Sequence, residues 1–224
     1  MKIAPAVAAI ERHGVLLVFP IANRPEPRSL WSVLHPRSKM RWAWHDGADE
    51  RVVALWHQRE VLARSGKVVY AKWFQGRATF FSRPVFRAML ATLKSTGHLT
   101  EGLSLHARDL LDLLEDNSPQ STKELRRAAN MQGRPMEAVY TRALKELWSR
   151  LLIVGVGEVN DGAFPSLAIG ATKLLFEDLW LAADTPKTAR DAKLLEETFP
   201  LKSPLRRELE KVKTALANVR AEHF

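Results

Sequence analysis

The chain has 224 residues, of which 46% are hydrophobic and 26% charged, with a formal net charge of +9 and no cysteine. The apolar fraction is that of an ordinary globular protein and argues against disorder. Without cysteine, a disulfide framework, an iron–sulfur cluster and a thiol nucleophile are excluded. No stretch approaches the roughly 18 apolar residues of a membrane helix. The first residues match a signal peptide poorly, because Pro5 interrupts a short apolar run. We therefore expect a cytoplasmic protein that does not enter a membrane.

The positive charge is concentrated in the first hundred residues. Residues 1–100 hold 16 basic and 6 acidic side chains, whereas residues 101–183 hold 9 and 12, and residues 184–224 hold 9 and 7. A basic half indicates a polyanionic partner such as nucleic acid or an anionic membrane surface. A solvated charged face is an equally good interpretation of composition alone.

Helix and strand signals alternate in the first part of the chain. Gly14 is a plausible helix stop, Ser29 a helix cap, and Gln75-Gly76 a hairpin turn between two β-rich runs. Asp46 or Asp49 can cap the helix that reaches Arg64. The predicted elements are a helix over 4–13, a strand over 15–19, a short helix over 29–34, the helix up to 64, a hairpin over 67–82 and a helix over 84–94.

Residues 103–171 predict the order helix, short helix, long helix and hairpin. Ser121 and Glu124 have the spacing of a capping box at the start of the short helix. Asn160-Asp161-Gly162 is the strongest turn signal in the chain. The predicted elements are helices over 103–115, 121–130 and 135–151 and strands over 153–159 and 166–171. This order is that of a winged helix–turn–helix.

The long helix has two faces by its periodicity. Met136, Val139, Ala143, Leu147 and Leu151 are expected to face the core. In a winged helix–turn–helix the long helix lies in the DNA major groove, so its polar face is the candidate contact surface. That face carries Arg134, Glu137, Thr141, Lys145 and Ser149, with Arg142 beside it.

Further candidate contacts come from the short helix and from the first hairpin. Lys123, Arg126 and Arg127 of the short helix are suited to phosphate contacts. The first hairpin offers Lys67, Lys72, Trp73 and Arg77, followed by Arg83, and we expect this basic half to be the better phosphate surface. A similar basic and aromatic mixture occurs at Lys39, Arg41, Trp42 and Trp44.

Two observations favour a plainer interpretation. A tryptophan is more often a core anchor than a base-stacking group, and we expect this of at least four of the seven. The second hairpin, or wing, is acidic over residues 158–164 and lacks the Arg or Lys that would hold a minor groove. Winged helices also act as protein-interaction modules, so a non-DNA role for the polar face stays open.

Signals for metal or cofactor chemistry are weak. The histidines lack helical metal-ligand spacing, and no phosphate-binding glycine loop, dinucleotide fingerprint or Gly-x-Ser-x-Gly motif is present. Acidic pairs such as Asp109 and Asp112 are typical of a solvated helix face. We predict no metal, no cofactor and no catalytic residue.

The C-terminal part is predicted to be helical. Leu205, Leu209, Val212, Leu216 and Val219 follow a heptad-like spacing, for which packing onto the body is favoured over dimerisation. The oligomeric state is left open. The pattern thus predicts a mostly helical α+β protein of tandem winged helix–turn–helix modules: 1–98 is a basic N-terminal module, 99–183 a second module and 184–224 a helical tail.

Three features together resemble a known family. They are Ser29-Leu30-Trp31 before a short helix, the helix and hairpin over 50–82, and Ala143-Leu144-Lys145-Glu146-Leu147 before a wing. In these the chain resembles bacterial winged-helix proteins of the AlkZ/YcaQ type over about residues 10–175. The resemblance implies DNA binding, and some members are glycosylases that unhook interstrand crosslinks or excise alkylated bases.

The chain departs from that family at its catalytic motif. The glycosylases use Gln-x-Gln near the N-terminus, whereas the glutamines here are Gln58, Gln75, Gln120 and Gln132, with no two so close. The chain is also shorter than the usual three-module members. We therefore expect a non-enzymatic protein that binds double-stranded DNA, in DNA repair or transcription regulation. The alternatives are a glycosylase-like repair enzyme and a protein-interaction scaffold.

Overall fold

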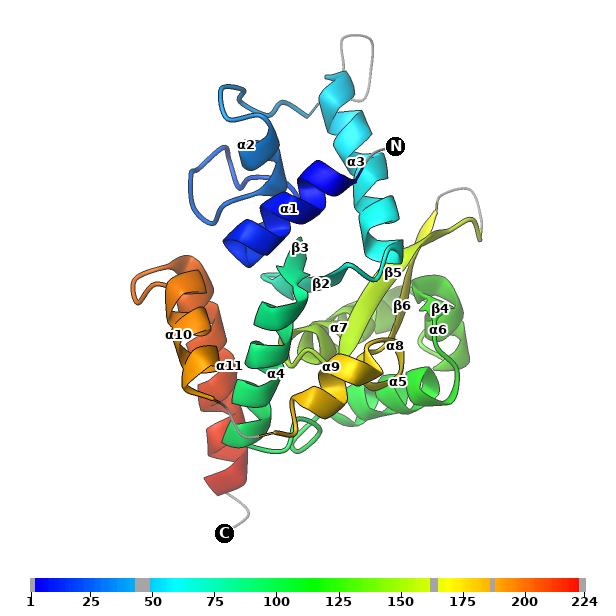
Figure 1. The fold of residues 1–224 in the computed structure, drawn as a ribbon. Helices are drawn as coiled ribbons and strands as arrows, with labels where there is room; N and C mark the ends of the chain where they lie inside the picture. The colour runs from blue at the N-terminus through cyan, green and yellow to red at the C-terminus, as the bar shows by residue number, and fades with distance from the viewer. Residues whose placement is uncertain (1–2, 43–48, 162–164, 186–187, 222–224) are drawn as a thin grey trace.

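A six-stranded antiparallel sheet forms the centre of this α+β fold (Figure 1). The computed structural model describes residues 3–42, 49–161, 165–185 and 188–221. The strand order is β1-β3-β2-β5-β6-β4. The strands are β1 Val15–Leu17, β2 Val68–Phe74, β3 Arg77–Ser82, β4 Gln120–Ser121, β5 Ile153–Val159 and β6 Ser166–Ala171.

Helices precede each hairpin and complete the C-terminal part. Those of the first half are α1 Ala4–His13, α2 Leu30–Leu34, α3 Glu50–Arg64 and α4 Arg83–Thr96. The next are α5 Leu105–Asp116, α6 Thr122–Ala128, a 3-10 turn over Arg134–Met136, and α7 Glu137–Ser149. The last are α8 Thr172–Leu175, α9 Glu177–Ala182, α10 Ala189–Thr198 and α11 Pro204–Ala221. In the described part of the chain, no helix has both the length and the apolar character needed to cross a bilayer.

The predicted caps determine where several helices begin. Ser29 and Ser32 form a reciprocal capping box at α2, and Ser121 and Glu124 form one at α6. Asp49 caps α3 by accepting from the backbone N–H of Arg51, whereas the alternative cap at position 46 lies outside the described residues. The predicted turn at 160–162 likewise extends beyond the described residues.

The two hairpins belong to one sheet. Strand β2 pairs with β5 through Tyr70 and Gly155. A Cβ on Gly155 would lie 2.3 Å from Cδ1 of Tyr70, so only glycine permits this close approach. The sequence does not indicate this pairing, because the signals for each hairpin lie in its own turn and strands.

Both faces of the sheet are covered, which explains the continuous apolar runs of β2. Val68 and Tyr70 pack in a core cluster with α1, α2 and α3. The alternate residues Val69, Ala71 and Trp73 pack in a second cluster with α4, α5 and α7. Figure 1 shows α1–α3 gathered at the top of the view and the remaining helices below them.

The order of elements repeats. The first half runs α1-β1-α2-α3-β2-β3 and the second runs α5-β4-α6-α7-β5-β6. In each half the short strand pairs with the last strand of the hairpin, and the halves meet where β2 pairs with β5. The sheet therefore has the same arrangement when followed from either edge.

The C-terminal helices are part of the same core. Leu205, Leu209, Val212 and Leu216 of α11 are buried in the cluster that contains α4. The expectation that this heptad-like stripe packs onto the body is confirmed.

Candidate nucleic-acid interface

The turn between α6 and α7 is held by side chains from both helices. Arg126 donates from Nε to the carbonyl oxygen of Met131 at 2.8 Å and from Nη2 to that of Gly133 at 3.0 Å. Its guanidinium lies 5.6 Å from the centre of the Tyr140 ring. The Tyr140 hydroxyl donates to the carbonyl oxygen of Thr122 at 2.7 Å. These contacts fix the angle between the two helices, and they engage the guanidinium that sequence reasoning assigned to a phosphate.

Helix α7 presents its cations to solvent. Arg134 in the preceding turn, together with Thr141, Arg142 and Lys145, is exposed. Arg127 of α6 is exposed as well. Within the described residues, none of these four cations forms an ion pair. The turn and the outer face of α7 thus form a surface with unneutralised positive charge, which we call the α7 surface.

The buried side of α7 is slightly rotated from the predicted one. Ala143 and Leu147 are buried as expected, but Met136 and Val139 are only partly buried. Tyr140 and Trp148 occupy the core positions instead. The predicted face was built from aliphatic residues and Met136 alone, so the two aromatic residues one position further along were not included.

Two acidic groups of the wing form ion pairs with cations of α6 and α3. Asp161 lies 3.1 Å from Nζ of Lys123, and hydrogen bonds from Ser121, Ser166 and Lys123 lower its pKa to about 2. Glu158 pairs with Arg59 of α3. Lys123 is therefore already engaged by a carboxylate, although its side chain stays partly exposed.

The candidate residues of the first hairpin do not form one surface. Lys67 and Arg77 are exposed, but they lie at opposite ends of the hairpin. Lys67 precedes β2 and Arg77 pairs with Phe74 at the other end of that strand, which places the two residues about 20 Å apart at the usual rise per residue. Lys72 is half-buried, and its pKa is lowered by burial and by the nearby Arg59.

Two of the hairpin candidates have structural contacts: Trp73 is buried in the core, and Arg83 is bonded at its edge. Trp73 is only 2% exposed, and its ring packs edge-on against Phe81 and Phe199, so the expectation of an exposed stacking aromatic there is wrong. Arg83 donates to the carbonyl oxygen of Gly66 at 2.7 Å and pairs with Asp178. As the first residue of α4, it links this helix to α9, which carries Asp178.

A buried ion pair joins the two halves. Arg59 is 6% exposed and pairs with Glu158, while its guanidinium lies 4.0 Å from the Trp56 ring centre. Arg64 donates to the backbone oxygen of Glu158 and pairs with Glu60. No local pattern in the sequence indicates this pair, since its partners are 99 residues apart.

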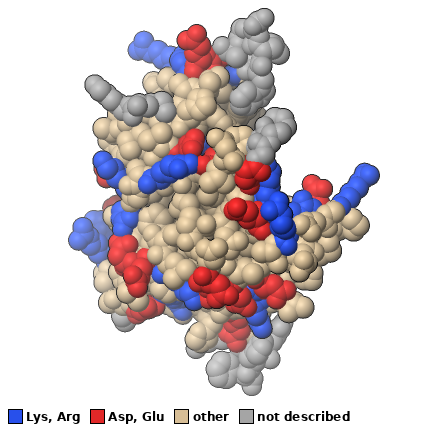
Figure 2. Space-filling model, turned by 90° about the vertical axis from the view of Figure 1, so that its right-hand side faces the viewer, with Lys and Arg blue, Asp and Glu red and all other residues tan. Residues whose placement is uncertain are grey.

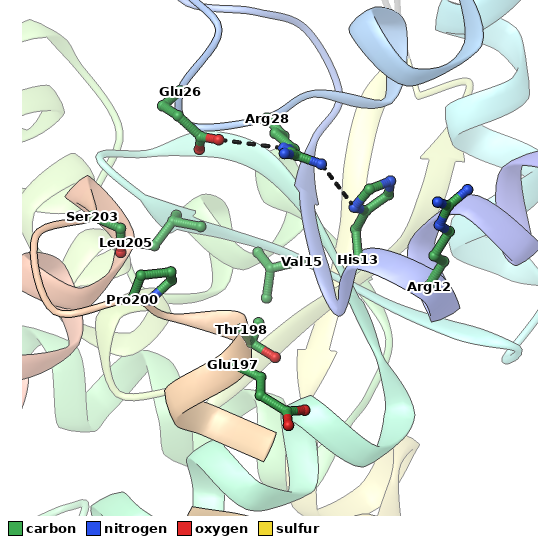
Figure 3. Close-up of a pocket in the computed structure, with 10 residues that line it drawn as sticks. All are labelled: Arg12, His13, Val15, Glu26, Arg28, Glu197, Thr198, Pro200, Ser203 and Leu205. Atoms are coloured by element: carbon green, nitrogen blue, oxygen red, sulfur yellow. Dashed lines mark hydrogen bonds and ion pairs between the residues drawn. The ribbon is translucent and has the colours of Figure 1, made fainter. Parts of the chain in front are cut away.

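A cavity of about 460 Å³ lies between the end of α1 and the turn that joins α10 and α11 (Figure 3). Figure 3 shows Arg28 directed toward both Glu26 and His13. Burial, together with Arg28 and Arg12, lowers the pKa of His13. Two arginines and two glutamates line the cavity, so its charge is balanced and it does not add to the positive surface.

Charge on the face seen in Figure 2 is mixed. Basic and acidic side chains lie near one another around a largely uncharged centre (Figure 2). The unpaired cations are therefore identified by their contacts rather than by the total charge.

The structure thus defines an α+β protein of two repeated units on one sheet, with exposed cations on helix α7 and on the turn before it in the second unit. The chain matches the AlkZ-related family over residues 2–193. Since this match covers most of its length, the chain belongs to the AlkZ-related family. No match was found among curated proteins or among solved structures.

Proposed function

We propose that the protein binds double-stranded DNA through the α7 surface, without catalysing a reaction on it, in a process connected with DNA repair. The observation that carries the proposal is the set of exposed cations at Arg127, Arg134, Arg142 and Lys145, which form no ion pair with any residue that the structure describes. Unneutralised cations on a helix can displace counterions from phosphates, whereas cations already paired to carboxylates gain less. Membership of the AlkZ-related family supports the connection with DNA repair.

In this proposal the two repeated units are winged helix–turn–helix modules. The element order and the pairing of the short strand with the last strand of each hairpin support that interpretation. The Arg126 contacts support it further, because they hold the backbone of the short turn between the two helices. Arg134, Thr141, Arg142 and Lys145 would contact the groove and its phosphates, with Arg127 on the flanking backbone.

The test is a salt titration of duplex binding by fluorescence anisotropy. A variant with Arg134→Gln, Arg142→Gln and Lys145→Gln should bind a random duplex about 10- to 100-fold more weakly at about 0.1 M salt. The slope of log affinity against log salt should become shallower by about 2.7, or about 0.9 for each phosphate that the variant no longer neutralises.

The matched control removes three exposed cations from the C-terminal helices and their connecting turn. Arg190→Gln, Lys202→Gln and Lys211→Gln change the net charge equally, and duplex affinity should stay within about twofold. Equally weakened binding in both variants would mean that only overall charge attracts DNA, and would contradict the α7 surface.

Family membership favours a second candidate, a glycosylase-like repair enzyme. Such an enzyme needs a pocket for a flipped base and a group that activates water. Incubation of the protein in excess with alkylated or crosslinked duplex, followed by cleavage at abasic sites, tests it. Strand breaks above the untreated control would establish this second function, and intact substrate would support the non-enzymatic one.

A further inference from the structure

Residues 37–42, between α2 and α3, form a second basic and aromatic surface outside the α7 surface. Arg37, Lys39, Arg41 and Trp42 are exposed, while Met40 between them is buried. Within the part of the chain that the structure describes, the three cations form no ion pair. We call residues 37–42 the aromatic–basic segment.

The aromatic–basic segment is held in place by specific contacts. Asn23 donates from Nδ2 to the carbonyl oxygen of Met40 at 2.9 Å, and its Oδ1 accepts from the backbone N–H of Met40 at 2.7 Å. Trp31 donates from Nε1 to the carbonyl oxygen of Ser38 at 3.1 Å, and Arg51 donates to the Ser38 hydroxyl at 2.8 Å. These bonds fix the backbone of an otherwise irregular segment.

Exposed and covered side chains alternate along the segment. Ser38 and Met40 point toward the body, and Lys39 and Arg41 point to solvent. Lys39 and Arg41 thus lie on the exposed side of the segment, with Met40 between them on the covered side. Together with Arg37 they form a short row of positive charge, which suits the backbone of one nucleic-acid strand.

An aromatic platform ends this row. The Trp42 side chain is 49% exposed, and its ring meets that of Phe19 edge-on with centres 4.7 Å apart. Phe19 in turn lies parallel to Trp56 at 6.5 Å. The indole is thus supported from within while part of it stays open to solvent.

Nearby acidic groups leave the surface positive. Asp49 is engaged by Arg51, from Nε at 2.9 Å and from Nη2 at 2.7 Å. Glu50 is the other carboxylate at the start of α3, and it is exposed. Among the described residues of this region, the cations at 37, 39 and 41 outnumber Glu50, the carboxylate there that forms no ion pair with an arginine.

We propose that the aromatic–basic segment binds single-stranded or unpaired DNA. In a duplex the faces of the bases are covered by their neighbours, so an indole can stack only on a base that has left the stack. Cations that follow one strand and an aromatic ring that receives a base are the features of single-strand binding. This proposal does not depend on duplex binding by the α7 surface.

The experiment compares a fluorescent oligothymidine with a duplex of equal length. Trp42→Ala should weaken oligothymidine binding about 5-fold or more, while duplex affinity stays within about twofold. Trp42→Phe should retain most of the affinity, because a phenyl ring can still stack. Arg37→Gln, Lys39→Gln and Arg41→Gln together should make the salt dependence for oligothymidine shallower by about 2.

The α7 variant with Arg134, Arg142 and Lys145 replaced separates the two proposals, since it should bind oligothymidine as the parent does. Two outcomes for Trp42→Ala would overturn the single-strand proposal. In one, the variant weakens duplex and oligothymidine binding equally; in the other, it leaves oligothymidine binding unchanged. Binding to phosphatidylserine vesicles tests whether the segment instead recognises a lipid surface. Vesicle binding that Trp42→Ala abolishes, without oligothymidine binding, would assign the segment to a lipid surface and overturn the proposal. Matched far-ultraviolet circular dichroism and melting curves establish that each variant folds.

Discussion

The two halves of the chain share one order of elements but use their cations differently. In the first half Arg59 and Arg64 of α3 are bound to carboxylates or to backbone oxygen. In the second half Arg142 and Lys145 of α7 point to solvent without an ion pair to any described residue. The half with the larger net charge therefore uses part of it to hold the fold together.

This difference follows from what each helix packs against. Helix α3 lies against β5, which carries Glu158, and that carboxylate draws Arg59 inward. Helix α7 lies against α5 and β2, and its buried residues, Tyr140, Ala143, Leu147 and Trp148, carry no charge, so its charged side chains stay toward solvent. Local net charge is thus a poor guide to a phosphate surface, since the cations without partners are the ones that can displace counterions.

The largest expected effect is on stability, at the Arg59–Glu158 ion pair that joins the two halves. Arg59→Gln leaves the largely buried Glu158 carboxylate without its cation and should lower the free energy of unfolding by about 3–5 kcal/mol. Urea unfolding measures this decrease. Arg59→Met combined with Glu158→Leu should recover much of it, because a buried pair can be replaced by apolar groups at little cost.

Lys193→Gln is the control for that joint, because Lys193 and Glu197 form an exposed pair that should contribute under about 0.5 kcal/mol. A decrease for Arg59→Gln as small as that of the control would mean that strand pairing and apolar packing alone join the halves.

The next prediction separates a positioning residue from a phosphate contact. Arg126→Gln removes both hydrogen bonds to the turn and should cost about 1–3 kcal/mol of stability. Duplex affinity should fall with little change in salt slope, because the protein still neutralises the same number of phosphates. Arg127→Gln should leave stability unchanged and make the slope shallower by about 0.9. If Arg126→Gln instead makes the salt slope shallower and Arg127→Gln does not, then Arg126 contacts a phosphate and Arg127 does not.

Local patterns predict the elements well and the long-range contacts poorly. The helix cap at Ser29, the capping box at Ser121, and the strands over 153–159 and 166–171 follow from signals within a few residues, and the structure confirms them. The pairing of Tyr70 with Gly155 joins hairpins that are distant in sequence, and no periodicity encodes it.

The candidate site is predictable to a similar degree. The exposure of Arg134, Thr141 and Lys145 follows from helical period alone. The burial of Trp73 does not, because β2 is covered on both faces and strand alternation then gives no exposed side. Which cations are paired depends on residues such as Asp178 and Glu158 that approach only in the folded chain.

A smaller effect is expected at the wing. The ordinary pKa of Asp161, 3.8, is lowered to about 2 in the folded protein, so its ionised form stabilises the fold above about pH 4. That contribution disappears as the pH falls toward 2. Asp161→Asn should therefore flatten the pH dependence of the melting temperature between about pH 4 and 2.

The same substitution removes the carboxylate that lies against Lys123 near the α7 surface. Loss of this negative charge should raise duplex affinity about two- to fivefold, with a steeper salt dependence. Anisotropy at several salt concentrations measures both. A weaker affinity would indicate that Asp161 orders the wing for binding rather than masking a cation.

The smallest effect is expected at the first hairpin, and it bears most directly on the comparison of the two halves. Lys67 and Arg77 are exposed, but they lie at opposite ends of the hairpin. Lys72 is partly buried, and Arg83 is hydrogen-bonded to the carbonyl oxygen of Gly66. We do not expect a rigid duplex bound to the α7 surface to contact both ends of that hairpin. Lys67→Gln with Arg77→Gln should therefore change duplex affinity by less than about threefold and the salt slope by less than about one. If affinity instead falls tenfold and the slope changes by about 1.8, both residues contact phosphate. The duplex would then extend across both halves, and the greater positive charge of the first half would serve binding as well as folding.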